Sequence, residues 1–323
     1  MRRINHIIII LLTLSCISCK VDFDFSDLES DPILFLDMDL RYDASDYNGD
    51  NIQGNPPLSL NGFIYAVPSA AGEREFPEDL RCRMDVYHNS ELTFTYDDIK
   101  LHEFHGSLAG QVYGLVPGDE VKVVAQAEGF PTATSTVIFP ESPPQLTVTH
   151  TRINSMTFRI SMTLEDAPET EDCYAFTFTK AYWNEGSLVP SGVSPLEPSF
   201  GNSDETGFLD IGPFEVIWED GVKFYGISDK TFNGKQKTIE LNVDYPLMRD
   251  EMEMISYYSI GLYRISPERM KYIAACQNKE NNILGFIGLA PATFAYTNVI
   301  GGTGCVSCTS YIETDWILIP PLK

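Results

Sequence analysis

The sequence predicts a mostly β protein, in which a β-sandwich is followed by a larger β-rich domain with one short helix. Two features of the chain indicate this class. Short segments of alternating apolar and polar residues, which are typical of strands, recur from residue 33 onward, and turn-rich pieces separate them. In addition, 43% of the 323 residues are apolar, which is enough to fill two cores of ordinary size.

The first domain is predicted over residues 33–145. Its strand-like segments read ILFLDMDLRY, NGFIYAV, CRMDVYH, ELTFTY, GQVYGL, EVKVVAQAE and STVIFP. Short alternating strands with regular turn signals are typical of a β-sandwich. The last segment ends at Pro140, and the two prolines in the following ESPPQ lack the N–H that a sheet ladder needs. We therefore place the domain boundary at residue 145.

The second domain is predicted over residues 146–323, as a sandwich or a barrel-like sheet. QLTVTHTRI, TFRISMTL and CYAFTFTKAYW are its first strand-like segments. Residues 184–207 are rich in Gly, Pro and Ser and are expected to form a long loop. Strands are expected to resume with FEVIWED, VKFYGI, KTIELNVDYP and MISYYSIGLYRI, and CVSCTSYIETDWILI closes the chain.

One helix is expected in the second domain. Ser266, Pro267 and Glu268 combine an N-cap serine, a proline at the first helical position and an acid in the first turn. The helix is expected to end near Asn281.

The N-terminus resembles a bacterial signal peptide, which we assign to residues 1–18. Two arginines form its basic region, and the apolar run of residues 7–14 is far shorter than the ~20 residues that span a bilayer. Cys19 follows a serine just beyond this run, as in the lipobox of bacterial lipoproteins, where a small residue precedes the acylated cysteine.

Cys19 is the predicted lipidation site, and Cys16 is the alternative because a serine precedes it as well. We prefer Cys19, since Lys20 and an acidic tether over residues 19–32 then begin the mature chain. The several acyl chains of a bacterial lipoprotein hold a protein firmly on a membrane. Outer-membrane lipid, reached through the acyl anchor, is therefore a predicted partner.

The formal charge of −24 argues against two classes of partner. A protein this acidic is repelled by nucleic acid and by anionic lipid headgroups, so we expect it to bind neither. The charge itself is explained by solubility and self-repulsion on a crowded surface.

The cysteines beyond the signal region do not form a disulfide framework. They are odd in number and widely spaced: Cys82, Cys173, Cys276, Cys305 and Cys308. The last two form a single CxxC before β-prone residues, and Cα atoms three apart in a strand lie about 10 Å from each other, beyond disulfide reach. A structural role, or pairing of either cysteine elsewhere, is favoured over redox chemistry.

Two segments invite a metal interpretation, and neither has the required spacing. His102 and His105 are one residue short of the HExxH of zinc peptidases, and in a strand they would point to opposite faces. The acidic loop around Asp46 and Asp50 lacks the order and the distal glutamate of an EF-hand. We predict no metal and no cofactor.

No catalytic motif is recognisable, so we predict that the protein is not an enzyme. Residues 301–304 (GGTG) have no following Lys-Ser/Thr and are interpreted as a turn or bulge between two strands. Tyr257, Tyr258, Tyr263, Trp183 and Trp218 could line a binding surface, but aromatics in β proteins more often fill cores. The ligand is not identifiable from these patterns.

Several motifs together resemble a lipoprotein family of Bacteroidota that is catalogued as a domain of unknown function (four-two-four-nine). The motifs are ILFLDMDL, Gly129-Phe130, IFPESPP, Ile227-Ser228-Asp229, Phe232-Asn233-Gly234-Lys235 and the segment Asn298 to Gly304. Their order and spacing cover nearly the whole mature chain. The sequence departs from the family at Cys305 and Cys308, where aliphatic and aromatic residues are usual, and at Val21 and Phe23, which interrupt the acidic export signal.

The resemblance implies an Ig-like first sandwich, a larger β-rich domain and a place on the outer membrane, facing the cell surface. It also implies a partner, because members are often encoded beside TonB-dependent transporters. We therefore expect an accessory binding protein in nutrient capture, which contacts the transporter through residues 184–207 and 229–235. The alternatives are an envelope hydrolase without a recognisable motif and a structural or adhesive surface protein.

Overall fold

The structure is a computed structural model that describes residues 32–44, 58–67, 79–101, 106–112, 115–168, 170–183, 191–199, 209–213, 223–245, 255–281 and 296–320. Residues 1–31, which include Cys16 and Cys19, and the segments 45–50 and 102–105 lie outside the described residues, so the predictions made for them are not addressed by the structure. The predicted mostly β class is confirmed, because strands form most of the described chain and α2 is the one α-helix within it.

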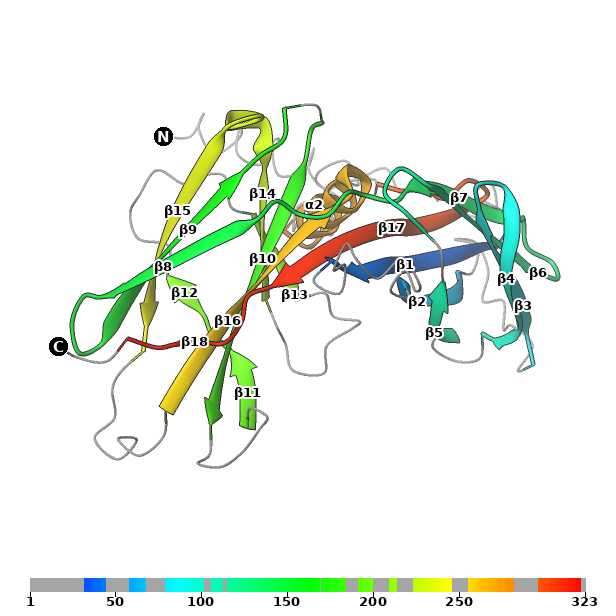
Figure 1. The fold of residues 1–323 in the computed structure, drawn as a ribbon. Coiled ribbons are helices and arrows are strands. Elements are labelled where there is room, and N and C mark those ends of the chain that lie inside the picture. Colours follow the sequence, from blue (N-terminus) through cyan, green and yellow to red (C-terminus); the bar gives the residue numbers. More distant parts are fainter. Residues whose placement is uncertain are drawn as a thin grey trace, which may run out of the picture.

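A ten-stranded sheet runs through the length of the molecule (Figure 1). Eight strands follow the order β13-β14-β10-β16-β17-β1-β2-β5, while β11 pairs with β10 and β18 with β16. The strands are β1 (Ile33–Asp43), β2 (Leu58–Val67), β5 (Gly106–Val112), β10 (Cys173–Trp183), β11 (Ser191–Pro195), β13 (Leu209–Pro213), β14 (Lys223–Ser228), β16 (Ile255–Ile265), β17 (Gly302–Glu313) and β18 (Ile317–Leu318).

Two four-stranded antiparallel sheets pack against this large sheet. One has the order β4-β3-β6-β7 and the other the order β12-β15-β9-β8. Their strands are β3 (Arg81–His88), β4 (Glu91–Lys100), β6 (Glu120–Ala127), β7 (Ala133–Ile138), β8 (Leu146–Arg152), β9 (Thr157–Glu165), β12 (Pro198–Ser199) and β15 (Gln236–Asp244). Each forms a sandwich with a different part of the large sheet, at the right and the left of Figure 1.

The first sandwich lies between β4-β3-β6-β7 and the β17-β1-β2-β5 part of the large sheet. Alternate residues of β1 point into its core and are fully buried: Leu34, Leu36, Met38 and Leu40. They pack with buried residues of β3 and β6, which include Cys82, Met84, Val86, Val121, Val123 and Ala125. Burial of one such large apolar side chain stabilises a fold by about 1.5–3 kcal/mol, so the alternation in ILFLDMDLRY determines which face of β1 is inside.

Residues 33–145 do not complete the first sandwich, which corrects the predicted domain division. The two cores do separate near residue 145, but one strand of the first sandwich is β17, which runs parallel to β1 over ten residue pairs. Val306 and Cys308 of β17 belong to the first core. The chain therefore returns to the first sandwich after it has built the second.

The second sandwich lies between β12-β15-β9-β8 and the β14-β10-β16 part of the large sheet. Its core residues include Phe158, Ile160, Met162, Leu164, Phe176, Phe178, Ile239, Leu241, Tyr258, Ile260 and Leu262. Ile312, which is on the same side of β17 as Val306, packs against this second core. Both four-stranded sheets therefore lie on one face of the large sheet.

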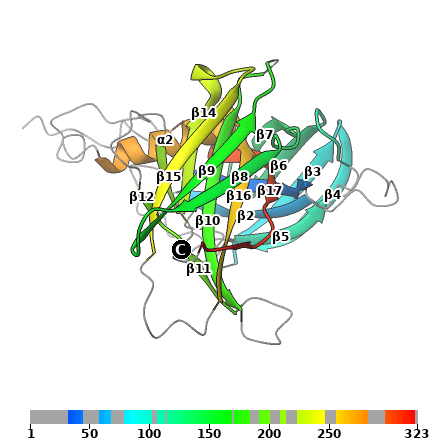
Figure 2. The same cartoon turned by 60° about the vertical axis from the view of Figure 1, so that its left-hand side comes forward.

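The helix α2 (Pro267–Asn281) covers the opposite face of the large sheet (Figure 2). The Ser266 hydroxyl accepts a hydrogen bond from the Arg269 backbone N–H at 3.2 Å, and Glu268 lies in the first turn, so the predicted helix start is confirmed. The buried residues between helix and sheet are Cys173, Ala175, Phe224, Tyr263, Ile265, Met270 and Ile273. Among the described residues, no helix combines the length and apolar character needed to cross a membrane.

Residues 184–207, which we predicted as one long loop, contain two short strands, so that prediction is wrong. β11 pairs with β10 and β12 pairs with β15. These strands have five and two residues, and a segment this short carries almost no local signal. Pairing with strands that are distant in sequence decides their conformation.

Gly304 allows β17 to pass close beside β1. Its φ is +102°, and a Cβ atom there would lie 2.1 Å from the carbonyl oxygen of Leu36. Gly301, at φ +75°, lies in the turn that precedes β17. Gly301 therefore forms the predicted turn, whereas residues 302–304 belong to β17 itself.

Candidate functional site

The two cysteines of the CxxC point to opposite faces of β17. Cys308 lies in the first core, whereas Cys305 lies beside Arg269 of α2. Both are free and buried, and burial raises the pKa of Cys305 to about 12 and the pKa of Cys308 well above its ordinary value. Protonated, buried thiols are poor nucleophiles, which agrees with the structural role inferred from their spacing.

Two of the three aromatic residues of β16 fill cores, whereas Tyr257 is only partly buried. Tyr258 packs in the second core and Tyr263 packs beneath α2, on opposite faces of the strand. This agrees with the core interpretation. The Trp183 side chain and Trp218 lie outside the described residues.

A closed polar layer joins α2 to the large sheet. Asp37, Asp39 and Arg41 occupy the face of β1 that is opposite the first core. Arg41 donates to Asp39 at 2.8 Å, Arg269 of α2 donates to Asp37, and two hydroxyl groups of β17 donate to Asp39. Burial favours a higher pKa for Asp39, but Arg41 and Arg269 hold that pKa below its ordinary value. The charges of the carboxylates and the guanidiniums neutralise each other in this layer, so we assign the layer a structural role.

Three buried carboxylates meet where β9 ends and β10 begins: Asp166, Asp172 and Asp229. Asp229 begins the short 3₁₀ helix η3 (Asp229–Thr231), which is capped by the hydroxyl of Ser228. It belongs to the Ile227-Ser228-Asp229 motif, and the Gly234 N–H of the next motif donates to Asp166 at 2.8 Å. The two motifs of the family resemblance thus build one carboxylate cluster.

Arg264 of β16 binds this carboxylate cluster from the large sheet. Its Nε and Nη2 donate to the two oxygens of Asp172 at 2.9 and 2.6 Å, a bidentate pair. Its Nη1 reaches Glu141 at 3.3 Å, which ties the segment between the sandwiches to the second one. Tyr174 donates to Asp166 at 2.5 Å.

A metal ion would have to compete with these donors. One ligand atom of each carboxylate lies within 4.8 Å of the others. Calcium takes about six to eight oxygen ligands, whereas both oxygens of Asp166 and of Asp172 already accept hydrogen bonds. Arg264 supplies the positive charge, so we assign the cluster a structural role.

Asp229 is the member of the cluster that lacks a full set of partners. Its Oδ2 accepts the Asp172 backbone N–H at 2.7 Å, while its buried Oδ1 has no partner. Burial, and then the negative charges of Asp166 and Asp172, raise the pKa of Asp229. Because the pKa of Asp229 is raised in the folded state, the protonated carboxyl stabilises the fold. This contribution to stability is complete below the ordinary pKa near 3.8, and it is lost as the pH rises through the raised value.

Asp229→Asn is expected to stabilise the protein at pH 7, because it removes a negative charge that burial disfavours. The amide stays neutral and still accepts the Asp172 N–H. Urea unfolding between pH 4 and pH 8 should show a smaller loss of stability in the variant as the pH rises. The exposed Asp244→Asn serves as the control. A variant less stable than the parent at pH 7 would show that the Asp229 charge is needed.

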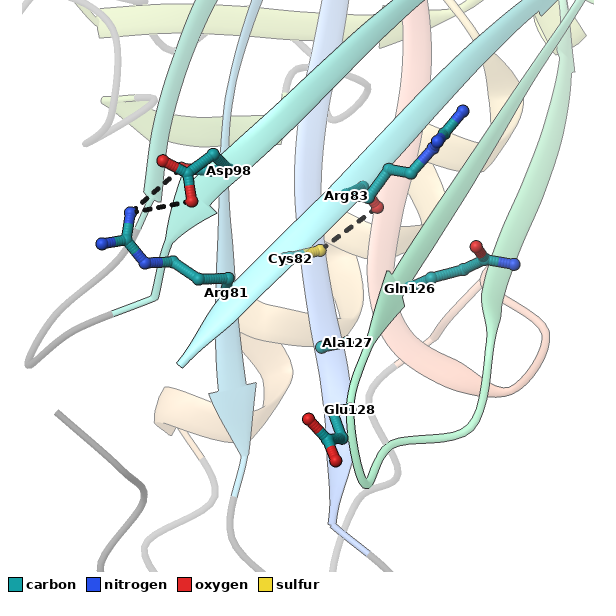
Figure 3. Close-up of a pocket in the computed structure, with 7 residues that line it drawn as sticks. All are labelled: Arg81, Cys82, Arg83, Asp98, Gln126, Ala127 and Glu128. Atoms are coloured by element: carbon teal, nitrogen blue, oxygen red, sulfur yellow. Dashed lines mark hydrogen bonds and ion pairs between the residues drawn. The ribbon is translucent and has the colours of Figure 1, made fainter. Parts of the chain in front are cut away.

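A pocket of about 300 Å³ lies on the first sandwich, between the start of β3 and the end of β6 (Figure 3). Arg81 is turned toward Asp98, with which it forms an ion pair at 3.1 Å, and Arg83 extends along β3 in the other direction. Arg83 pairs with Asp85 at 3.0 Å. Both arginines of this pocket are therefore already paired with acids of the same sandwich.

A second set of polar residues lies on the second sandwich, near the end of β8. Leu146, Val148, His150 and Arg152 share the inner face of β8. His150 Nδ1 lies 2.8 Å from the hydroxyl oxygen of Tyr258. Burial lowers the pKa of His150, so its ring is neutral at pH 7.

Arg152 lies among aromatic rings. Its Cζ is 5.7 Å from the ring centre of Phe158, and its Nη1 donates to the backbone carbonyl of Tyr245 at 3.1 Å. Lys180 Nζ lies 5.3 Å from the ring centre of Tyr245. We call the group formed by His150, Arg152, Phe158, Lys180, Tyr245 and Tyr258 the Arg152 cluster.

Neither cation of the Arg152 cluster pairs with a carboxylate among the described residues. The whole chain has 46 acidic and 22 basic side chains, so bases have abundant partners. Arg264 and Arg269, which are more deeply buried, both bind carboxylates. Burial lowers the pKa of Arg152, and Tyr245 acts in the opposite direction. An unpaired, desolvated guanidinium is costly for the fold, which makes the Arg152 cluster the candidate binding site.

Sequence reasoning predicted the strand QLTVTHTRI but not this site. The signal was present, because His150 and Arg152 continue the inward positions of Leu146 and Val148. Polar residues at core-facing positions of a strand are exceptions that mark either edge protection or function. Their aromatic neighbours come from other strands and could not be inferred.

No protein-family model matches the sequence, and no curated protein matches it. Among solved structures, the chain is weakly similar to a red sea bream transglutaminase, with 8% identity and a TM-score of 0.19, over 79% of this chain and 28% of that one. It is also weakly similar to the yeast delta-COP-I mu-homology domain, with 8% identity and a TM-score of 0.21, over 90% and 98% of the two chains. Likeness at this level has no bearing on function.

Proposed function

We propose that this protein is a lipid-anchored binding protein of a Gram-negative cell envelope, which assists a TonB-dependent outer-membrane transporter in nutrient capture. The observation that carries the binding role is the pair of unpaired cations, Arg152 and Lys180, beside aromatic rings in a strongly acidic protein. Cys19 behind a short apolar run supports the anchor. The resemblance to the Bacteroidota lipoproteins supports the transporter.

A binding role fits the Arg152 cluster better than a catalytic one. The neutral ring of His150 is engaged by Tyr258, and burial raises the pKa of that hydroxyl well above its ordinary value. A phenol held protonated in this way is not a nucleophile at pH 7. The cations and the aromatic rings of the Arg152 cluster remain available to a ligand, and such groups recognise ligands by charge and by stacking.

Cys19→Ala is expected to abolish acylation and to release the protein from the outer membrane, whereas Cys16→Ala is expected to leave both unchanged. Mass spectrometry of the mature N-terminus and membrane fractionation measure the two effects. Acylated Cys19→Ala protein, together with unacylated Cys16→Ala protein, would move the anchor to Cys16. An unacylated parent protein would end the lipoprotein proposal.

Photo-crosslinking tests the partner. A crosslinker at exposed Lys230, in the 229–235 turn, is expected to trap a TonB-dependent transporter in native outer membranes. The same group at exposed Lys100 of the first sandwich is the matched control and is expected to trap less. Recovery of the protein alone from both positions, with nutrient uptake unchanged after deletion of its gene, would overturn the accessory role.

A further inference from the structure

We propose that the Arg152 cluster binds a carboxylate, which docks side-on against Nε and Nη2 of Arg152. This inference rests on the proposed binding function and names the chemical class of its ligand. It starts from two nitrogens, since Nε and Nη2 of Arg152 are buried and have no hydrogen-bond partner in the part of the chain that the structure describes. Together they carry three N–H donors, while Nη1 is already used by the Tyr245 carbonyl.

Arg264 of the same protein shows which group binds to the Nε and Nη2 side of a guanidinium. In Arg264, Nε and Nη2 hold the two oxygens of Asp172 at 2.9 and 2.6 Å. Arg152 presents the identical pair of nitrogens without an acid. A planar carboxylate matches this edge with two parallel hydrogen bonds, which a lysine cannot reproduce.

The surroundings favour a carboxylate that is attached to an apolar or aromatic group. Phe158 and Tyr258 lie 5.6 Å apart between ring centres, and Phe158 also contacts the guanidinium. Lys180, whose Nζ lies 5.3 Å from the ring centre of Tyr245, adds a second positive charge. The rings offer apolar surface to the body of such a ligand, which an inorganic phosphate lacks.

The position of Arg152 in the fold makes ligand entry feasible. Arg152 is the last residue of β8, which is an edge strand of its sheet, and its side chain as a whole is only partly buried. Side chains at this end must move aside for the ligand, but the core strands β9 and β15 keep their pairing. Loops and strand ends are where such movement costs least.

The test uses the full mature chain and two probes that differ in one group. N-acetyl-phenylalanine is expected to raise the melting temperature and to give a saturable heat signal, whereas N-acetyl-phenylalanine amide, which lacks the carboxylate, is expected to do neither. Arg152→Lys should weaken binding of the acid at least tenfold, and Arg152→Met should abolish it. Arg159→Lys, on the exposed face of β9, is the matched control and should bind like the parent.

The unliganded variants separate a binding role from a structural one. If Arg152 serves a ligand, Arg152→Met removes a desolvated charge and leaves the melting temperature equal or higher. A lower melting temperature together with no response of the parent to the acid would assign Arg152 to the fold and overturn the proposal. Inorganic phosphate bound more tightly than the acid would also overturn it. Because these measurements use purified protein, they can succeed even if the transporter role fails.

Discussion

A fragment that ends at residue 145 is expected to remain unfolded, and a peptide of residues 296–320 is expected to restore its fold. Without β17, the central strand β1 becomes an unpaired edge, and the first core loses Val299, Val306 and Cys308. Each buried side chain of this kind contributes about 1–3 kcal/mol, against a total stability of about 5–15 kcal/mol for a domain. Circular dichroism and amide dispersion of residues 33–145, with and without the peptide, measure the effect.

The control for this complementation is a peptide with Val306→Asp, which places a charge in the core and should not restore the fold. Gly304→Ala should fail as well, because its Cβ would meet the Leu36 carbonyl. A fragment of residues 33–145 that unfolds cooperatively by itself would contradict the role assigned to β17.

Arg264→Met is expected to destabilise the second sandwich by about 3–5 kcal/mol, because it leaves the buried Asp172 without its counter-charge. Arg264 also holds Glu141 and the Thr170 hydroxyl, so one side chain joins β16 to two loops. Urea unfolding of the full chain measures the change.

The matched control is Arg159→Met, which breaks an exposed pair with Glu240 at 3.5 Å and should cost less than about 1 kcal/mol. The double variant Arg264→Met with Asp172→Asn should recover part of the lost stability, because the buried charge is then gone. Equal effects of Arg264→Met and Arg159→Met would show that the pair of Arg264 with Asp172 does not stabilise the second sandwich.

Local patterns in the sequence were sufficient to identify most elements of the fold. The alternation in ILFLDMDLRY identifies β1, because side chains of a strand point to opposite faces with a period of two. Ser266, Pro267 and Glu268 identify the start of α2, because capping and backbone constraints act within one turn. The spacing of Cys305 and Cys308 argues against a bridge between them in an extended strand, and in the structure both are free. All of these are short-range effects that a single segment carries by itself.

Only the tertiary structure decided what covers each face and which strands are neighbours. The same alternation in β1 does not say that Asp37 and Asp39 meet α2 instead of water, nor that β17 lies beside β1. The carboxylate cluster and the Arg152 cluster likewise join residues up to about a hundred positions apart. Such contacts depend on strand order and register, which arise from burial summed over the whole chain and leave no mark on any one segment.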